Sequence, residues 1–379
     1  MPIFDQGYQH WDGEMRGHAW RWLAITRQGL RTGLKNRVTR TFLLLAWVTA
    51  LALVFMLCVW GLLERKSELV APLVPLLSFI EPRILADPKH YRLEIWTICY
   101  DYFLLTELRF SMVLILMVGP GLISQDLRFN ALPLYFSRPL RRIDYFVGKW
   151  GVIAALLGMV IVVPAVVAYA LGLLFSLDLS ILRDTYRLLL SSVLYGGIVA
   201  ASAGLLVLAL SALSRNSRYV VLFWLGIWFV SSVLGTVLTQ VDHEQREHAA
   251  YRRAAIAPTT LRENETPQER QRRFRAFNEA YRKAQDEVRA EEVRAAARDW
   301  RPTVSYTANL SRVGQYLLGT NAQWEKLSLL RPTSQRARFL YDFMGPQYPW
   351  YWSGFVLVGL FGLSACILNF RVKSLDRLK

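Results

Sequence analysis

The sequence predicts an all-α membrane protein with six transmembrane helices, on the strength of three observations. Hydrophobic residues make up 53% of the 379 positions and charged residues only 20%. The mean hydropathy is +0.23, which is high for a soluble chain. The apolar residues also gather in long runs, and about 20 of them in a helix cross a bilayer. The six predicted spans are residues 41–63, 103–123, 150–175, 188–213, 219–241 and 350–370.

The predicted spans carry almost no charge. The last four contain no Asp, Glu, Lys, Arg or His, and the first contains no charged residue. The second contains Glu107 and Arg109, which we expect near its outer end in an interfacial arrangement, with a gating or substrate role as the alternative. Ion-coupled carriers need ionisable or broken-helix sites near mid-membrane, so this class is disfavoured.

The basic residues predict the orientation of the spans. Segments 1–40, 124–149, 214–218 and 371–379 together hold 18 Lys and Arg but only 6 acidic residues, whereas the short loops 64–102 and 176–187 hold 7 and 8. Short loops rich in Lys and Arg stay in the cytoplasm. We therefore expect both termini inside, in a bacterial inner membrane. The net charge of +16 then reflects loops beside anionic lipid, and no nucleic-acid partner is predicted.

The chain divides into four parts on this topology. Residues 1–40 form a cytoplasmic N-terminus, which lacks the pattern of a cleaved signal peptide. Residues 41–241 hold the first five spans and the cytoplasmic loop 124–149. Residues 242–349 form a large extracytoplasmic insertion, because long loops cross the membrane regardless of charge. Residues 350–379 hold the sixth span and a cytoplasmic tail.

Residues 15–38 read as an amphipathic helix lying on the inner leaflet. Its apolar positions recur at helical spacing, beside a basic row and two tryptophans, a composition typical of interfacial helices. A solvated lead-in to the first span is the alternative. The apolar positions are Ala19, Leu23, Thr26, Leu30, Leu34 and Val38, and the predicted membrane-interface residues are Trp20, Trp22, Arg27, Arg31 and Lys35.

The insertion contains a long charged helix that begins at a recognisable cap. Thr266-Pro-Gln-Glu269 is a capping box with proline at the first helical position. A narrow apolar stripe follows, and the pattern ends at Trp300 and Pro302. We expect this helix to pack on the rest of the insertion or on a second copy, or else to be solvated throughout.

No enzymatic chemistry or cofactor site is evident. Gly148-Lys149 lacks the remainder of a phosphate-binding loop, and His243 and His248 lie five apart, which is wrong for a zinc-protease helix. Cys58, Cys99 and Cys366 cannot form a disulfide framework or a four-thiolate metal site. We therefore expect neither a metal nor a bound cofactor.

The loop after the second span is the most informative segment. After Ser124, Gln125 and Asp126, which we read as a polar turn, it carries an amphipathic stretch from Leu127 to Phe136 and a break at 137–139. Apolar groups in a loop facing water are costly unless they rest on headgroups or on a partner protein. The segment is therefore either an interfacial anchor or a docking element that passes motion from a soluble partner into the spans.

At these residues the chain resembles the ABC-2 type transporter permeases. Asp126 stands at an acidic position of that family, 132–136 at its coupling stretch, Ser137-Arg138-Pro139-Leu140 at a turn, and Gly148-Lys149 before the third span. The layout of an N-terminal interfacial helix, six spans and an insertion before the last span is also similar. The family often has Glu in place of Asp126 and Gly in place of Asn130.

The resemblance implies a permease subunit of an ATP-driven exporter. Separate ATPase subunits would bind ATP and magnesium, and a second permease subunit, identical or related, would complete the transporter. A hydrophobic or amphipathic substrate is expected because the spans offer no charged pathway. The implied ATPase-coupling contacts are Asp126, Arg128, Leu132, Tyr135, Phe136, Ser137, Arg138 and Pro139. The alternative is a membrane anchor that presents the insertion as a binding or structural module.

Overall fold

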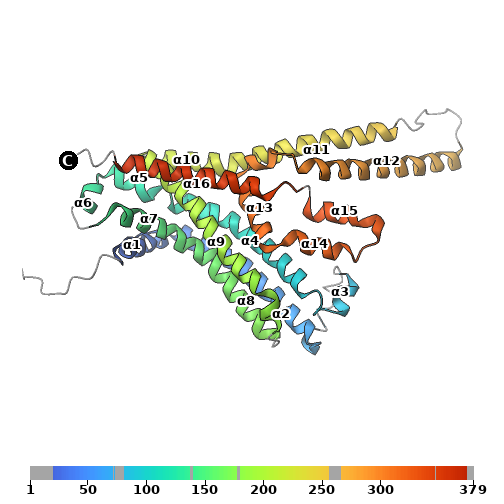
Figure 1. Ribbon diagram of the computed structural model, residues 1–379, viewed down its shortest axis with the longest axis horizontal. Coiled ribbons are helices and arrows are strands. Elements are labelled where there is room, and N and C mark those ends of the chain that lie inside the picture. Colours follow the sequence, from blue (N-terminus) through green and yellow to red (C-terminus); the bar gives the residue numbers. More distant parts are fainter. Residues whose placement is uncertain are drawn as a thin grey trace, which may run out of the picture.

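The chain folds into helices joined by turns. The computed structural model describes residues 20–70, 72, 81–136, 140–176, 180–255, 266–345 and 347–373, and among these there is no strand. The helices pack into an elongated bundle from which one helical hairpin projects (Figure 1). The predicted all-α class is confirmed.

All six predicted spans are present as helices long and apolar enough to cross a membrane. Three are single helices: α2 (Arg37–Glu64), α9 (Ser180–Leu213) and α16 (Trp350–Lys373). The other three are composite. They comprise α4 (Arg92–Val118) with α5 (Gly121–Arg128), α7 (Arg142–Leu157) with α8 (Val163–Ser176), and α10 (Ser217–Leu225) with α11 (Ser231–Ala255).

Two of the composite spans contain a π-helical turn. One turn, Gly158–Val162, ends two residues before Pro164, and the other is Gly226–Val230. Proline lacks the N–H of a regular helix and crowds the carbonyl four residues earlier, so the wider turn accommodates it. Both turns lie within spans, where every backbone polar group has to be satisfied internally.

The second span begins at Arg92, eleven residues before the predicted start at 103. The stretch that begins at Arg92 was left out of the predicted span because its charged residues lower the local hydropathy. In the folded protein Arg92 and Glu94 are paired inside the protein. Arg92 forms a bidentate contact with Glu64, with N–O distances of 2.6 and 2.8 Å, and both side chains are buried. Arg92 also lies 3.7 Å from Asp184, so one cation joins three spans. Pairing of this kind makes charge tolerable in a span.

Glu107 does not lie near the end of the second span, as predicted, but close to its middle. Its carboxylate is fully buried and accepts a hydrogen bond from Thr49, which lies near the midpoint of α2. The early start at Arg92 moves the membrane-embedded part of this helix toward its N-terminus, which explains the error. The second span therefore carries an acid at mid-depth, with a hydroxyl of the first span as its partner.

Helix α9 lies at the centre of the bundle and packs on α4, α7 and α16. Its small residues, such as Ala200 and Gly204, allow close contact with the neighbouring helices. The indole of Trp150 lies over Gly204 and donates to the Ala200 carbonyl at 3.0 Å. Gly196 makes a close contact with Val162, whereas Gly197 has no neighbour near the position that a Cβ would take.

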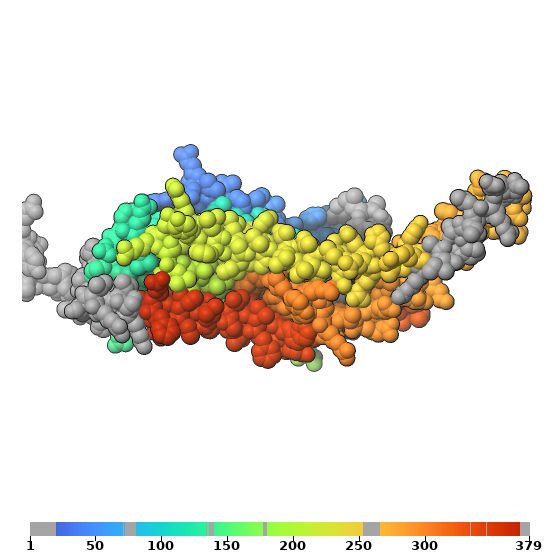
Figure 2. All heavy atoms as spheres, turned by 90° about the horizontal axis from the view of Figure 1, so that it is seen from above, coloured from blue at the N-terminus to red at the C-terminus, as the bar shows by residue number. Residues whose placement is uncertain are grey.

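The insertion forms a projecting hairpin and a helical cap. Helix α11 continues without a break past residue 241, and α12 (Pro267–Ala296) runs back along it (Figures 1 and 2). The capping box of Thr266 and Glu269 is confirmed, although the helix ends at Ala296 rather than near Trp300. The cap consists of α13 (Tyr306–Leu318), α14 (Thr320–Ser328), α15 (Thr333–Met344) and the short α3 (Pro82–Ala86).

The bundle has two ends, which we name after the helices that lie there. The α6 end carries α1 (Arg21–Lys35), α5, α6 (Leu132–Phe136) and the start of α7, and the α12 end carries the hairpin and the cap (Figure 1). Figure 2 shows α10, α11 and α16 side by side along one face. Many apolar side chains on this face are exposed, which is expected of surfaces that meet lipid or another subunit.

Replacing Glu64 by alanine should strongly destabilise the bundle, because Arg92 would remain as a buried charge without its main partner. The expected loss is about 3 kcal/mol of unfolding free energy. Arg338→Ala removes an exposed pair with Asp342 and serves as the control, with an expected loss below about 0.5 kcal/mol. Titration of the purified variants with a denaturing detergent measures both, and equal losses would show that the buried pair contributes nothing special.

Candidate coupling site

The α6 end is held to the centre of the bundle by one serine of α9. The Ser211 hydroxyl accepts hydrogen bonds from the backbone N–H groups of Ile123 and Ser124, at 3.1 and 2.9 Å, and donates to the Pro120 carbonyl at 2.9 Å. The first N–H groups of a helix have no partner within it, so these contacts cap α5. The residues 124–126, predicted as a polar turn, instead belong to this helix.

Asp126 points into the protein and joins α5 to α7. Its carboxylate accepts a hydrogen bond from the Tyr145 hydroxyl at 2.7 Å and lies 2.7 Å from the Lys149 ammonium. That ammonium also lies over the rings of Tyr135 and Tyr145, at 5.7 and 5.5 Å from their centroids. We call these four residues the Asp126 cluster. Burial and the Asp126 charge raise the pKa of Tyr135, so its phenol stays protonated.

The turn after α5 requires an unusual backbone conformation. Asn130 has φ of +54°, in the left-handed region that side chains with a Cβ rarely adopt. Asparagine tolerates this region better than other non-glycine residues, and glycine adopts it freely. The departure of Asn130 from the glycine frequent in similar permeases is therefore a substitution that keeps the turn. The turn closes with a hydrogen bond from the Ala131 N–H to the Asp126 carbonyl, at 2.9 Å.

An apolar and basic surface lies outside this turn. Phe129 is 73% exposed, with the Arg128 guanidinium 5.6 Å from its ring centroid, and Ile143 at the start of α7 is 65% exposed. Asn130 and Pro133 are exposed beside them. We call Arg128, Phe129, Asn130, Pro133 and Ile143 the coupling surface. Large apolar groups exposed beside cations at one end of a helix bundle favour contact with a partner or with headgroups.

The predicted coupling residues fall on different sides of this structure. Arg128 is exposed, whereas Leu132 is buried and Asp126 and Tyr135 belong to the Asp126 cluster. Phe136 ends α6, and its side chain lies outside the described residues together with Ser137, Arg138 and Pro139. Sequence reasoning missed Phe129 and Ser211. It also gave no role to Tyr145, although its place four residues before Lys149 puts both on one helical face.

Helix α1 packs directly on α7 through glycines. A Cβ on Gly148 would lie 2.7 Å from the Ile25 side chain, and one on Gly151 only 2.5 Å from Thr26. The buried Thr26 hydroxyl donates to the Gly148 carbonyl at 2.9 Å. The glycine before Lys149 is therefore needed for close helix contact.

The other side of α1 agrees with an interfacial position. Arg27, Arg31 and Lys35 are exposed, and Trp20 is 71% exposed and stacks on the half-buried Trp22. Helix α1 ends at Lys35 rather than at residue 38, because Asn36 turns the chain and caps α2. Of the predicted apolar stripe, Leu23 and Val38 are exposed, and Ala19 lies outside the described residues. The placement of α1 on a membrane surface stays a prediction.

An open cavity of about 640 Å³ separates α1 from α5 and α10. Asp126, Tyr135 and Lys149 border it, together with Gln28 of α1 and Ser217 of α10. The Asp126 cluster is thus reached from this cavity, although it is mostly shielded by its neighbours. A change in the separation of α1 and α5 would expose or bury it.

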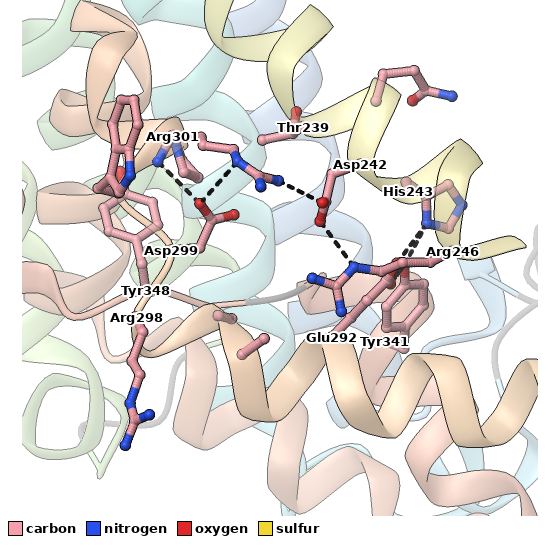
Figure 3. Close-up of a pocket in the computed structure, with 15 residues that line it drawn as sticks. Thr239, Asp242, His243, Arg246, Glu292, Arg298, Asp299, Arg301, Tyr341 and Tyr348 are labelled. Carbon is pink, nitrogen blue, oxygen red and sulfur yellow. Dashed lines mark hydrogen bonds and ion pairs between the residues drawn. The ribbon is translucent and has the colours of Figure 1, made fainter. Parts of the chain in front are cut away.

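A second polar cluster lies at the α12 end, around a cavity of about 550 Å³ (Figure 3). Glu292 of α12 accepts a hydrogen bond from Tyr341 of α15, and its carboxylate lies 3.0 Å from Nδ1 of His243 on α11. Burial and the Glu292 carboxylate raise the pKa of Tyr341. Asp242 is held between Arg301 and Arg246, at 2.8 and 2.9 Å. These contacts tie the base of the hairpin to the cap.

The described residues do not form a metal site. Within the ranges that the structure describes, no three His, Cys, Asp or Glu side chains are placed to hold a metal ion. His243 is engaged with Glu292, and the second histidine of the pair noted in the sequence, His248, has no part in that contact. The absence of a cofactor stays a prediction.

Six apolar helices around a packed core define an integral membrane protein, and comparison with known proteins identifies its family. The sequence profile of the ABC-2 family transporter proteins matches residues 98–314, more than half of the chain. The chain therefore belongs to the ABC-2 family of transporter proteins, as a membrane permease component. No curated protein and no solved structure matches it. The matched residues include α5, α6 and the whole Asp126 cluster.

A double-mutant cycle should show that Asp126 acts chiefly within the chain. Asp126→Asn leaves the buried Lys149 ammonium without its charged partner and should cost about 3 kcal/mol of unfolding free energy, whereas Lys149→Met leaves a half-buried Asp126 carboxylate and should cost less. The double variant should be more stable than the sum of the single effects implies, by at least about 1 kcal/mol. Thermal unfolding in detergent measures the three variants. Effects that simply add would mean that the contact between Asp126 and Lys149 contributes nothing.

Proposed function

We propose that the chain is the membrane subunit of an ATP-driven exporter and that a separate ATPase binds its coupling surface. Three observations support the proposal: the family match, the exposed Phe129 beside Arg128 with Ile143 exposed at the start of α7, and the contacts that join α5 to α7 and α9. The coupling surface is the main support for the proposal. Among the described residues between α5 and α7, it holds the large apolar side chains that are most exposed.

The contacts behind the coupling surface provide a path for force. A partner that displaces α5 and α6 would move α7 through the contact between Asp126 and Lys149, and α9 through the hydrogen bonds of Ser211. Helix α1 would follow α7 because their backbones are in close contact at Gly148. Packed helices change position as units rather than deforming continuously. Nucleotide-driven closure of the ATPase would thus shift three spans together.

The proposed orientation places the α6 end in the cytoplasm and the α12 end outside. The excess of Lys and Arg in segments 1–40 and 124–149 supports it. An ATPase partner requires the coupling surface to face the cytoplasm, where ATP is available. The bacterial inner membrane follows from the same arrangement, with both termini inside.

The proposed substrate is hydrophobic or amphipathic. Of the buried ionisable side chains in the spans, Arg92 and Lys149 are paired within the chain, and Glu107 is bonded to Thr49. Arg92 and Lys149 are thus engaged with acidic partners, and Glu107 is bonded through one carboxylate oxygen, so these groups do not form a continuous path for a charged solute. Two permease subunits and two ATPase subunits would make up the transporter, and whether the permeases are identical is left open by the sequence.

A membrane anchor for an exterior module is the second candidate function. The hairpin of α11 and α12 favours it, because a 30-residue helix projecting from a bundle offers a large surface to a partner. Coupling distinguishes the two, since an anchor has no need of an ATPase contact at the α6 end.

Charge reversal and truncation on the coupling surface should weaken ATPase binding. We expect Arg128→Glu with Phe129→Ala to lower co-purification of the partner ATPase about tenfold or more, since exposed aromatic and arginine side chains dominate such interfaces. Arg338→Glu with Phe274→Ala makes the same changes at exposed sites near the α12 end and should have no effect. Both variants should insert normally. Undiminished co-purification and transport in the first variant would remove the docking proposal.

The orientation can be tested with tags in intact cells. An epitope inserted at residue 265, in the connection between α11 and α12, should be cleaved by added protease, because the hairpin faces outward. An epitope at residue 379 should be protected. The reverse pattern would invert the topology and with it the assignment of the ATPase to the α6 end.

A further inference from the structure

An apolar cavity of about 350 Å³ lies between the first two spans at the α12 end. One wall consists of Met56, Val59, Trp60 and Leu63, which recur along one face of α2. The facing wall is formed by α4 at the same helical spacing, with Ile95, Ile98, Cys99 and Tyr102. The volume is at the lower end of the range found for small-molecule sites. The cavity therefore has the shape of a channel between two helices.

The cap of the insertion roofs this channel with aromatic side chains. Trp324 of α14 stacks on Phe343 of α15 at 4.7 Å between ring centroids, and Phe339 lies 4.8 Å from Phe343. Trp324 is only 9% exposed, and Leu327 beside it 5%. The roof joins elements that are far apart in the sequence, so the cavity exists only because the insertion folds back onto the spans.

The channel has a closed floor and an open side. Val59 and Trp60 are buried, whereas Met56, Tyr102 and Phe343 are 41%, 54% and 49% exposed. Met56 and Tyr102 belong to the first two spans, where exposed side chains meet lipid, whereas Phe343 belongs to the cap above them. The opening is therefore lateral, toward the hydrocarbon of the membrane rather than toward water.

The length of the cavity along α2 corresponds to part of one lipid acyl chain. Leu63 lies one residue before the end of α2 at Glu64, and Met56 lies seven residues deeper. Seven residues of helix correspond to about 10 Å. The cavity therefore extends about 10 Å along α2 from the C-terminal end of that helix.

Charge occurs only at the rim among the lining residues. Arg331 lies 2.9 Å from Glu81 and 5.7 Å from the ring centroid of Phe339. Glu81 and Arg331 are the only two charged residues of the sixteen that line the cavity. Trp60 supplies a further polar group, an indole N–H that is buried and has no acceptor among the described residues. An apolar cavity with an ion pair at its rim and one buried N–H donor complements an amphiphile rather than a polar solute.

We propose that this cavity binds one alkyl chain of an amphiphile, with the polar head at Glu81 and Arg331. The chain enters sideways between α2 and α4 and lies under Trp324 and Phe343. Two sources share this chemistry: a lipid of the adjacent leaflet, or an exported amphiphile on its way out. The proposal requires only that the chain is embedded in a membrane, so it does not depend on transport or on an ATPase.

Photochemical labelling of the chain alone in lipid nanodiscs tests the proposal. The probe is a phosphatidylcholine with a diazirine in one acyl chain, and mass spectrometry maps the labelled residues. We expect adducts on the α14 segment that contains Trp324 and Leu327. Lipid on the outer surface cannot reach these buried side chains, but it should label the exposed Val48 of α2, which provides an internal reference.

Filling the cavity should abolish the α14 adducts. Cys99→Trp places an indole in the channel and should reduce α14 labelling at least fivefold, while labelling around Val48 stays unchanged. Val48→Trp, the same kind of residue on the lipid-facing side of α2, should leave α14 labelling intact. Absence of α14 adducts in the native chain, or equal labelling in Cys99→Trp, would overturn the proposal.

A second form of the filling experiment avoids a mutation in the core. A chain with Cys58→Ser and Cys366→Ser folds with Cys99 as its one thiol, which a benzyl maleimide then alkylates. The expected loss of α14 labelling is the same, and unchanged labelling after complete alkylation would contradict the proposal.

The source of the alkyl chain can then be assigned. ATP-dependent export by the native transporter and by the Cys99→Trp variant is compared after equal association with the ATPase. Loss of export assigns the site to exported cargo, and unchanged export assigns it to a resident lipid. Both results keep the alkyl-chain site, and failure of export in the native chain would count against the proposed function alone.

Discussion

The contact between Asp126 and Lys149 is the interaction on which the proposed coupling depends. It joins a helix that ends at the exposed coupling surface to one that runs through the whole bundle. Removing either partner alone leaves a buried charge, which costs far more than the pair contributes when intact. Such a contact makes α5 and α7 move as one body. The exposed residues can then be bound by a partner without the risk that they shift independently of the spans.

Buried charged groups are also bonded to partners in the rest of the membrane-embedded part. Arg92 is satisfied by Glu64 and lies near Asp184, and Glu107 is bonded to Thr49. Each of these contacts links two different spans, so polar groups that would be costly in lipid serve to fix helix positions. At the α12 end the insertion completes this arrangement. Lys326 of α14 lies 3.3 Å from the buried Glu94 and so joins the cap to the second span.

The sequence predicted the number of spans and the capping of α12 because these features depend on local composition. The prediction was incomplete where contacts with residues far away in the sequence decide the location of a side chain. Arg92 and Glu94 read as loop residues, yet their ionic partners place them inside a span. The inward contacts of Asp126 were not predicted, because only the three-dimensional position of Tyr145 and Lys149 reveals them, and its contact with an ATPase stays a prediction. The fold-back of α14 and α15 was likewise not predicted, because contacts between α14 and α4 leave no periodic signal in either segment.

The central claim is that this chain is a passive conduit driven from the α6 end. Its most direct test places the purified chain in vesicles with a fluorescent single-chain amphiphile, with and without the partner ATPase. The account predicts ATP-dependent movement of the amphiphile only when the ATPase is present, and its loss in the Arg128→Glu, Phe129→Ala variant. Movement driven by ATP or by an ion gradient in vesicles that contain this chain alone would contradict it.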